Sequence, residues 1–172
     1  MEPGEALSTA AQIAVALAGF AGVVVAFRSR SLHDWSAVDK YRLWLLLANA
    51  FVSLLSCLFA MLLLTVKPTL VWIWHWCSGF SFLLIFLIGS LGLRRQAELG
   101  RREMKSIGPY RYAYYVLAVL GTAVGLLQAY NALRSGLFWL FYAAIVFQLA
   151  IGTFQFARMI LLPPQADKSE IE

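Results

Sequence analysis

Charged residues are scarce in this chain and are missing from the middle of its long apolar stretches. Asp, Glu, Lys and Arg make up 13% of the 172 residues, and apolar side chains make up 61%. Soluble domains carry about 25% charged and roughly 45–50% apolar residues. This little charge cannot cover a soluble domain, and the apolar content excludes disorder, which needs low hydrophobicity and high net charge. The composition therefore predicts a membrane protein with several spans.

The side chains that most membrane chemistry requires are also scarce. Proton-coupled transporters and pumps depend on carboxylates or paired charges inside the membrane, and no such charge lies deep in an apolar stretch. The two cysteines, Cys57 and Cys77, and the one histidine of an apolar stretch, His75, show no metal-type or redox-type spacing. We therefore expect no enzyme activity, no catalytic residue, no metal and no cofactor. Whether these three side chains do more than pack stays open.

Five apolar stretches are each long enough to cross a bilayer as a helix. A span needs about 20 residues, and these stretches have 21–24. They are continuously apolar, whereas the strands of a membrane barrel alternate over about ten residues. The expected fold class is all-α, a polytopic transmembrane helical bundle that forms a single domain over 1–172 without a soluble domain. The spans are expected at 7–27, 43–66, 70–93, 112–133 and 137–160.

Lysine and arginine alternate between the segments that flank these stretches. In chain order, the six segments carry zero, four, one, six, one and two basic residues. Because cytoplasmic loops are enriched in Lys and Arg, the expected orientation has the N-terminus outside and the C-terminus inside. No basic residue precedes the first stretch, whereas a signal peptide needs a basic start, so we expect this stretch to be retained as a span.

Local signals extend two of the helices beyond the membrane. Ser36, with Asp39 three residues later, resembles a helix N-cap followed by an acidic residue, so the second helix is expected to begin before its apolar stretch. The segment "RRQAEL" after Leu93 can continue the third helix until Gly100 ends it.

Small residues recur at helical spacing in two stretches. Helices in a bilayer associate through close backbone approach at small residues, so we expect these positions to meet another helix, either within the chain or between subunits. The expected packing or oligomer ridge consists of Ala14, Ala18, Gly22, Gly121 and Gly125.

Each stretch also holds a few uncharged polar side chains. Inside a bundle they would form hydrogen bonds between helices, and around an oligomer axis they would line a pore for a small solute or ion. We favour the first interpretation. The polar positions are Gln12, Asn49, Ser53, Ser78, Ser81, Thr122, Gln128, Gln148, Thr153 and Gln155.

The loop after the third stretch is the most basic part of the chain. Its charges determine topology, and they can also hold anionic lipid headgroups, at about 1 kcal/mol per basic residue near the surface. The expected headgroup contacts are Arg94, Arg95, Arg101, Arg102 and Lys105.

The first stretch, "AQIAVALAGFAGVVVAFRSR", resembles the opening of uncharacterised small bacterial integral membrane proteins that start with an Ala/Gly-rich "AGF" helix. The resemblance covers about residues 11–30. It implies a multi-pass protein of the bacterial inner membrane, and it implies no particular activity.

These observations lead to one expected function and one alternative. The expected function is a non-enzymatic integral membrane protein that acts through protein or lipid contacts, as a homo-oligomer or as a subunit of a membrane complex. The expected partners are membrane lipids, including anionic ones, and a second copy or another membrane protein, but no nucleic acid. The alternative is an oligomeric passive channel or facilitator.

Overall fold

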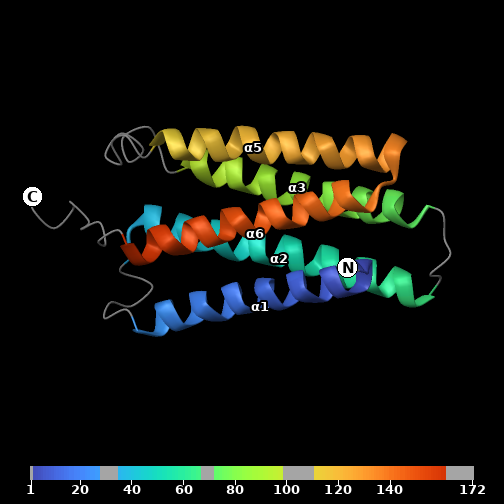
Figure 1. Cartoon of the computed structure of the whole chain (residues 1–172). Coiled ribbons are helices and arrows are strands. Elements are labelled where there is room, and N and C mark those ends of the chain that lie inside the picture. The colour runs from blue at the N-terminus through green and yellow to red at the C-terminus, as the bar shows by residue number, and fades with distance from the viewer. Residues whose placement is uncertain (1, 28–34, 67–71, 99–110, 162–172) are drawn as a thin grey trace, which may run out of the picture.

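The computed structural model of the chain is a bundle of long helices running side by side (Figure 1). It describes residues 2–27, 35–66, 72–98 and 111–161, and these ranges contain no strand. The elements are α1 (Pro3–Phe27), α2 (Ala37–Val66), α3 (Ile73–Glu98), α5 (Arg111–Tyr130), the π-helical turn η3 (Asn131–Ser135) and α6 (Phe138–Leu161).

Five of these helices are long and apolar enough to cross a membrane. This confirms the all-α fold class and the expectation of five candidate spans. The helices extend beyond the apolar stretches, most of all in α2, which begins six residues before the expected start at 43. At that point the backbone N–H of Asp39 donates to the Ser36 Oγ at 3.2 Å, so the predicted N-cap is confirmed.

The third helix likewise continues past its apolar stretch, as expected. It ends at Glu98, five residues beyond Leu93, and its last turn is basic. A cation near a helix C-terminus is favourable because the backbone dipole places partial negative charge there. Gly100, the predicted stop, lies outside the described residues.

The centre of the bundle is formed by α2 and α6. Within the most apolar 18-residue segment of each helix, half of the residues of α2 and of α6 are buried, against 22% in each of the other three helices. Helix α1 packs against both α2 and α6, whereas α5 packs mainly on α3 (Figure 1). The fourth helix, α5, therefore lies at the edge of the bundle.

The buried face of α1 departs from the expected ridge. The row Ala10, Ala14, Leu17 and Ala21 is buried, whereas Gly22 is exposed and a Cβ added there would meet nothing within 4 Å. An α-helix has about 3.6 residues per turn, so eleven residues bring the chain back to the same face and repeated steps of four rotate away from it. Gly22 therefore contacts no other helix in the described chain, and its role between subunits stays a prediction.

Gly152 marks a close junction of three helices. A Cβ added there would lie 3.6 Å from the Leu17 side chain of α1 and 3.9 Å from both the Asn49 Cβ and the Leu46 carbonyl oxygen of α2. Close backbone approach at a small residue is the usual way that membrane helices pack. This contact fixes α6 against α1 and α2 and determines the direction in which the flanking side chains of α6 point.

Candidate functional site

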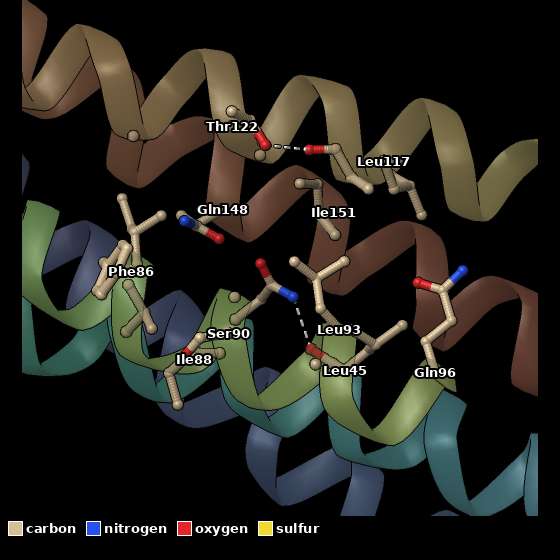
Figure 2. Close-up of a pocket in the computed structure, with 18 of the residues that line it drawn as sticks. Leu45, Phe86, Ile88, Ser90, Leu93, Gln96, Leu117, Thr122, Gln148 and Ile151 are labelled. Atoms are coloured by element: carbon tan, nitrogen blue, oxygen red, sulfur yellow. Dashed lines mark hydrogen bonds between the residues drawn. The ribbon is translucent and has the colours of Figure 1, made fainter. Parts of the chain in front are cut away.

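A cavity of about 500 Å³ lies between α2, α3, α5 and α6 (Figure 2). This volume falls within the roughly 300–1,000 Å³ of small-molecule sites. The cavity occupies the half of the bundle nearer the C-terminal ends of α3 and α6, which we call the Arg95 end. Its walls are formed mainly by aliphatic and aromatic side chains, namely Leu45, Val52, Phe82, Ile85, Phe86, Ile88, Leu93, Leu117, Leu126 and Ile151.

Two glycines of α5 show how the cavity arises. At Gly125 an added Cβ would lie 3.5 Å from the Ile85 side chain, so α5 and α3 are in van der Waals contact there. One turn along, at Gly121, an added Cβ would meet nothing within 4 Å, although this residue lines the cavity. The space between the helices therefore opens within one turn, and the missing side chain at Gly121 leaves it unfilled.

Among the residues that the structure describes, the lining of the cavity contains no Asp, Glu, Lys or Arg. Transfer of an isolated ionised group into such surroundings is far more costly than transfer of a neutral polar group. The polar atoms available to a bound molecule come from hydroxyl and amide side chains instead. The polar lining residues are Tyr41, Asn49, Ser90, Gln96, Thr122, Gln148 and Gln155, with the indole of Trp44.

Three amides gather where α6 faces α2 across the cavity. Gln148 and Gln155 are seven residues apart, about two helical turns, so they share one face of α6 and flank Gly152. Asn49 of α2 lies level with Gly152. Its Nδ2 donates to the Leu45 carbonyl oxygen of its own helix at 2.6 Å. Figure 2 shows the Gln148 amide pointing from α6 into the space between α3 and α5.

Gln155 is the most unusual of the three. Its side chain is 0% exposed, and neither its Oε1 nor its Nε2 has a hydrogen-bond partner among the described residues. A buried polar group left without a partner costs about 1–3 kcal/mol. The protein therefore keeps, next to an apolar cavity, one buried amide that carries this cost.

The other fully buried amides are bonded to their neighbours. The Gln128 Nε2 donates to the Leu140 carbonyl oxygen at 2.9 Å, although its Oε1 has no partner among the described residues. Asn131 donates to Ser78 and exchanges two hydrogen bonds with the backbone of Leu137. Among the fully buried amides of the described chain, Gln155 is thus the one with both polar atoms unpaired.

Aromatic side chains close the Arg95 end of the cavity. The Tyr41 hydroxyl donates to the Gly92 carbonyl oxygen at 3.3 Å, and the Trp44 ring packs so tightly on Gly92 that an added Cβ would lie 3.2 Å from it. The Arg95 guanidinium lies 4.8 Å from the centroid of a Trp44 ring, within the range of a cation–π contact. The charge therefore stays next to the cavity but outside its lining.

The predicted headgroup residues divide into two groups. Arg94 and Arg95 are exposed on the last turns of α3. Arg101, Arg102 and Lys105 lie outside the described residues. Of the predicted ridge, Ala14 and Gly125 are buried and Ala18 and Gly121 are half-buried. Only Gly121 and Gly125 of this set line the cavity.

Some of the uncharged polar side chains in the apolar stretches form the predicted hydrogen bonds between helices. The Ser56 and Ser81 hydroxyls join α2 to α3 at 3.3 Å, and Ser78 and Gln128 also bond other elements. Thr122 and Thr153 instead donate to backbone carbonyls four residues earlier in their own helices. Sequence reasoning treated Asn49, Gln148 and Gln155 as members of this set and did not separate them as a site, although the spacing of seven on α6 was a usable signal.

One further side chain has a contact that the sequence did not indicate. The His75 Nδ1 lies 2.8 Å from the Ala132 carbonyl oxygen, which ties α3 to η3. Cys57 and Cys77 belong to one apolar core cluster and are free thiols.

Comparison of the chain with protein-family models, with curated proteins and with solved structures gave no match. The structure defines the class, which is a helical bundle with five candidate membrane-spanning helices.

Proposed function

We propose that this chain is a non-enzymatic integral membrane protein that binds a lipid or a lipid-like amphiphile in the cavity between α2, α3, α5 and α6. One observation carries the proposal: the cavity is apolar over most of its wall and has a few uncharged polar side chains in its lining, among them Gln148, which points into it. Small-molecule sites have this character, a mostly apolar pocket with a few polar groups that fix orientation.

The outer surface of the bundle is suited to contact with lipid. Large apolar side chains outside the cavity are exposed on every long helix, for example Phe20, Leu62, Leu83, Val119 and Phe154. Several hydroxyls of the outer helix faces bond to carbonyls of their own helices and so present no free donor to hydrocarbon, namely those of Thr9, Thr65 and Thr153. An oligomeric channel, the alternative, would need a polar face turned toward its axis, and these bonds favour the lipid-binding function over it.

We further propose the bacterial inner membrane as the location, with the N-terminus outside. The counts of Lys and Arg support this orientation, because basic residues gather in cytoplasmic loops. In this orientation the Arg95 end of the cavity faces the cytoplasm. Arg94 and Arg95 would then meet the headgroups of anionic lipids, and the outer face of α1 around Gly22 would be available to a second copy or to another membrane protein.

The test of ligand binding uses a substitution that fills the cavity without disturbing a contact. Gly121→Leu adds a side chain where a Cβ meets nothing within 4 Å, so the helices need not move. Gly19→Leu makes the same change on an exposed part of α1 that also offers open space, outside the cavity. Both variants gain the helix preference of leucine over glycine, so the comparison isolates the cavity.

The measurement is native mass spectrometry of the protein released from detergent, with bound lipid identified after extraction. We expect the wild type and Gly19→Leu to retain an amphiphile and Gly121→Leu to lose at least nine-tenths of it. Equal retention by all three proteins would show that bound lipid lies elsewhere and would refute the cavity as the binding site.

A further inference from the structure

The cavity and the arginine at its end lie close enough to hold two parts of one ligand, and this step rests on the proposed function of the cavity. We infer that the ligand is an anionic lipid, whose headgroup lies beside Arg95 and one of whose acyl chains lies in the cavity. Arg95 then selects the charge of the ligand, whereas the neighbouring Arg94 does not.

The cavity reaches the surface of the bundle next to Arg95. Leu93 and Gln96 stand on either side of the two arginines in the sequence of α3, and both line the cavity. Leu93 is nevertheless largely exposed and Gln96 is only half-buried. Figure 2 shows these two side chains together with Leu117 of α5 at one end of the cavity. A headgroup at this end therefore stays outside the bundle while its chain lies between the helices.

Helix geometry places Arg95, but not Arg94, on the side of α3 that borders the cavity. Residues seven apart lie on nearly the same face of a helix. Seven residues before Arg95 is Ile88, which lines the cavity, and seven before Arg94 is Leu87, which is exposed and outside the lining. The Arg95 guanidinium also lies 4.8 Å from the centroid of a ring of Trp44, itself a lining residue. Arg95 thus contacts the wall of the cavity from outside.

The contact with Trp44 leaves the charge of Arg95 available to an anion. An aromatic face attracts a cation through its quadrupole and carries no full negative charge, so the guanidinium keeps its positive charge. A guanidinium can bind two oxygens of a phosphate or carboxylate at once. An anionic headgroup beside Arg95 gains this interaction and keeps its hydration, because it does not enter the apolar interior.

The other charged side chains at the Arg95 end favour an anion as well. Arg158 follows the lining residue Gln155 by one turn of α6 and is buried, so it adds a positive charge behind the cavity wall. Asp39 forms an ion pair with Arg42 at 3.1 Å. Basic residues outnumber acidic ones on the described helix ends here: Lys40, Arg42, Arg94, Arg95, Arg111 and Arg158 against Asp39 and Glu98.

The remainder of the cavity suits an acyl chain. Its wall on α3 is apolar at Phe82, Ile85 and Phe86, and from Leu93 to Phe82 the lining extends about 16 Å along the helix. Phe86 of α3 and Leu126 of α5 line the cavity and are largely exposed, so the cavity is also open at the side of the bundle. A chain can therefore enter from the membrane without separating the helices.

The test compares two lipid probes with identical acyl chains, each with a diazirine in one chain. One is phosphatidylglycerol, which is anionic, and the other is phosphatidylcholine, which is zwitterionic. The purified full chain is placed in phosphatidylcholine vesicles with one probe at a fixed, low mole fraction and irradiated. Labels on Ile85, Leu117 and Ile151 are quantified by peptide mass spectrometry. The anionic probe should label these residues at least fivefold more, which corresponds to about 1 kcal/mol.

The two arginines provide matched variants for this test. Arg95→Gln removes the charge beside the cavity and should reduce the preference for the anionic probe to less than twofold. Arg94→Gln removes the same charge from the adjacent residue and should leave the preference above threefold. Both side chains are exposed, so neither change disturbs buried packing. Arg95→Lys keeps the charge and should retain more of the preference than Arg95→Gln does.

The outcomes separate this inference from the proposed function. Equal labelling of the wild type by both probes, equal losses in Arg94→Gln and Arg95→Gln, or an Arg95→Lys variant with no more preference than Arg95→Gln would overturn the inference while cavity binding stands. Labels on Ile85, Leu117 and Ile151 that persist in Gly121→Leu with both probes would overturn the proposed function itself, because the chain would then lie outside the cavity.

Discussion

The side chain of Asn131 joins η3 to α3: its Nδ2 donates to the Ser78 Oγ at 2.7 Å, although 53 residues separate the two along the chain. The same amide also exchanges hydrogen bonds with Leu137, from its Nδ2 to the carbonyl oxygen at 3.0 Å and from the backbone N–H to its Oδ1 at 2.9 Å. One buried side chain thus connects α3, η3 and the start of α6, at the opposite end of the bundle from Arg95.

Replacement of this amide should destabilise the fold. Asn131→Leu keeps a similar volume but leaves the Leu137 N–H and C=O without their side-chain partner, so we expect a loss of about 1–3 kcal/mol in the free energy of unfolding. Ser78→Ala removes a single hydrogen bond between helices and should cost only about 0.6 kcal/mol. Thermal unfolding of both variants in the same detergent measures the difference. Equal, small losses would contradict the connecting role of Asn131.

Gly136 and His75 form a second coupled pair near this end. Gly136 has φ of +56°, and a Cβ added there would overlap the His75 ring, which is bonded to the Ala132 carbonyl oxygen. The left-handed conformation alone costs an L-residue about 1–2 kcal/mol, so Gly136→Ala should lower stability by at least this amount. The loss should shrink when His75→Ala is also present, because the overlap is then removed. Strictly additive effects in thermal unfolding would contradict the steric part of this account.

Because Ala14 and Gly22 lie on different faces of α1, a leucine at the two positions should have different effects on unfolding stability. Ala14 is 1% exposed, so Ala14→Leu should overpack the interface and lower stability by about 1–3 kcal/mol. Gly22→Leu adds its side chain into open space and should not lower the stability of the single chain. If the outer face of α1 also meets another subunit, Gly22→Leu should reduce the size of the detergent-solubilised particle. A large loss of unfolding stability without a change in size would contradict the position of Gly22 on the outer face.

The Gln155 amide should lower the stability of the protein. Because both of its polar atoms are buried without partners among the described residues, the protein carries their desolvation cost. Gln155→Met should therefore raise the unfolding free energy of delipidated protein by about 1–3 kcal/mol. A lower unfolding temperature for the delipidated variant would indicate that the amide has a structural partner.

The orientation of the chain is open to direct labelling. In a background with Cys57→Ala and Cys77→Ala, the variants His33→Cys and Glu103→Cys should be protected from a membrane-impermeant thiol reagent in intact cells. Ser135→Cys should react, because the expected topology puts this position outside. Reaction at position 103 in intact cells, with protection at 135, would reverse the orientation.

The sequence predicts the helices better than it predicts the site. Length and continuous apolarity are local properties, and they suffice to indicate five spans; the cap at Ser36 is local too. The buried face of a helix depends on the helices that pack against it. A row of small residues at a strict spacing of four, such as Ala14, Ala18 and Gly22, therefore only approximates the buried face of α1. The cavity depends on where α5 stops touching its neighbours, between Gly125 and Gly121, and no local pattern encodes that separation.

The amide side chains of the apolar helices likewise depend on packing for their roles. A sequence shows that Gln128, Gln148 and Gln155 lie in apolar helices, and each could equally form a hydrogen bond between helices. Only the packing shows that Gln128 donates to the Leu140 carbonyl oxygen while Gln155 has no partner in the described chain. Whether a buried amide is bonded or unpaired is therefore a tertiary property.

The central claim, that an amphiphile binds inside the bundle, is tested most directly by photocrosslinking in native membranes. A diazirine-bearing alkyl amphiphile is added and irradiated, and the labelled residues are mapped by peptide mass spectrometry. We expect labels on cavity-lining residues of α3, α5 and α6, such as Ile85, Leu117 and Ile151, and their loss when excess amphiphile without the diazirine competes or when Gly121→Leu is present. Labels spread over outward-facing residues such as Val15 and Val119, unchanged by competitor and by Gly121→Leu, would contradict it.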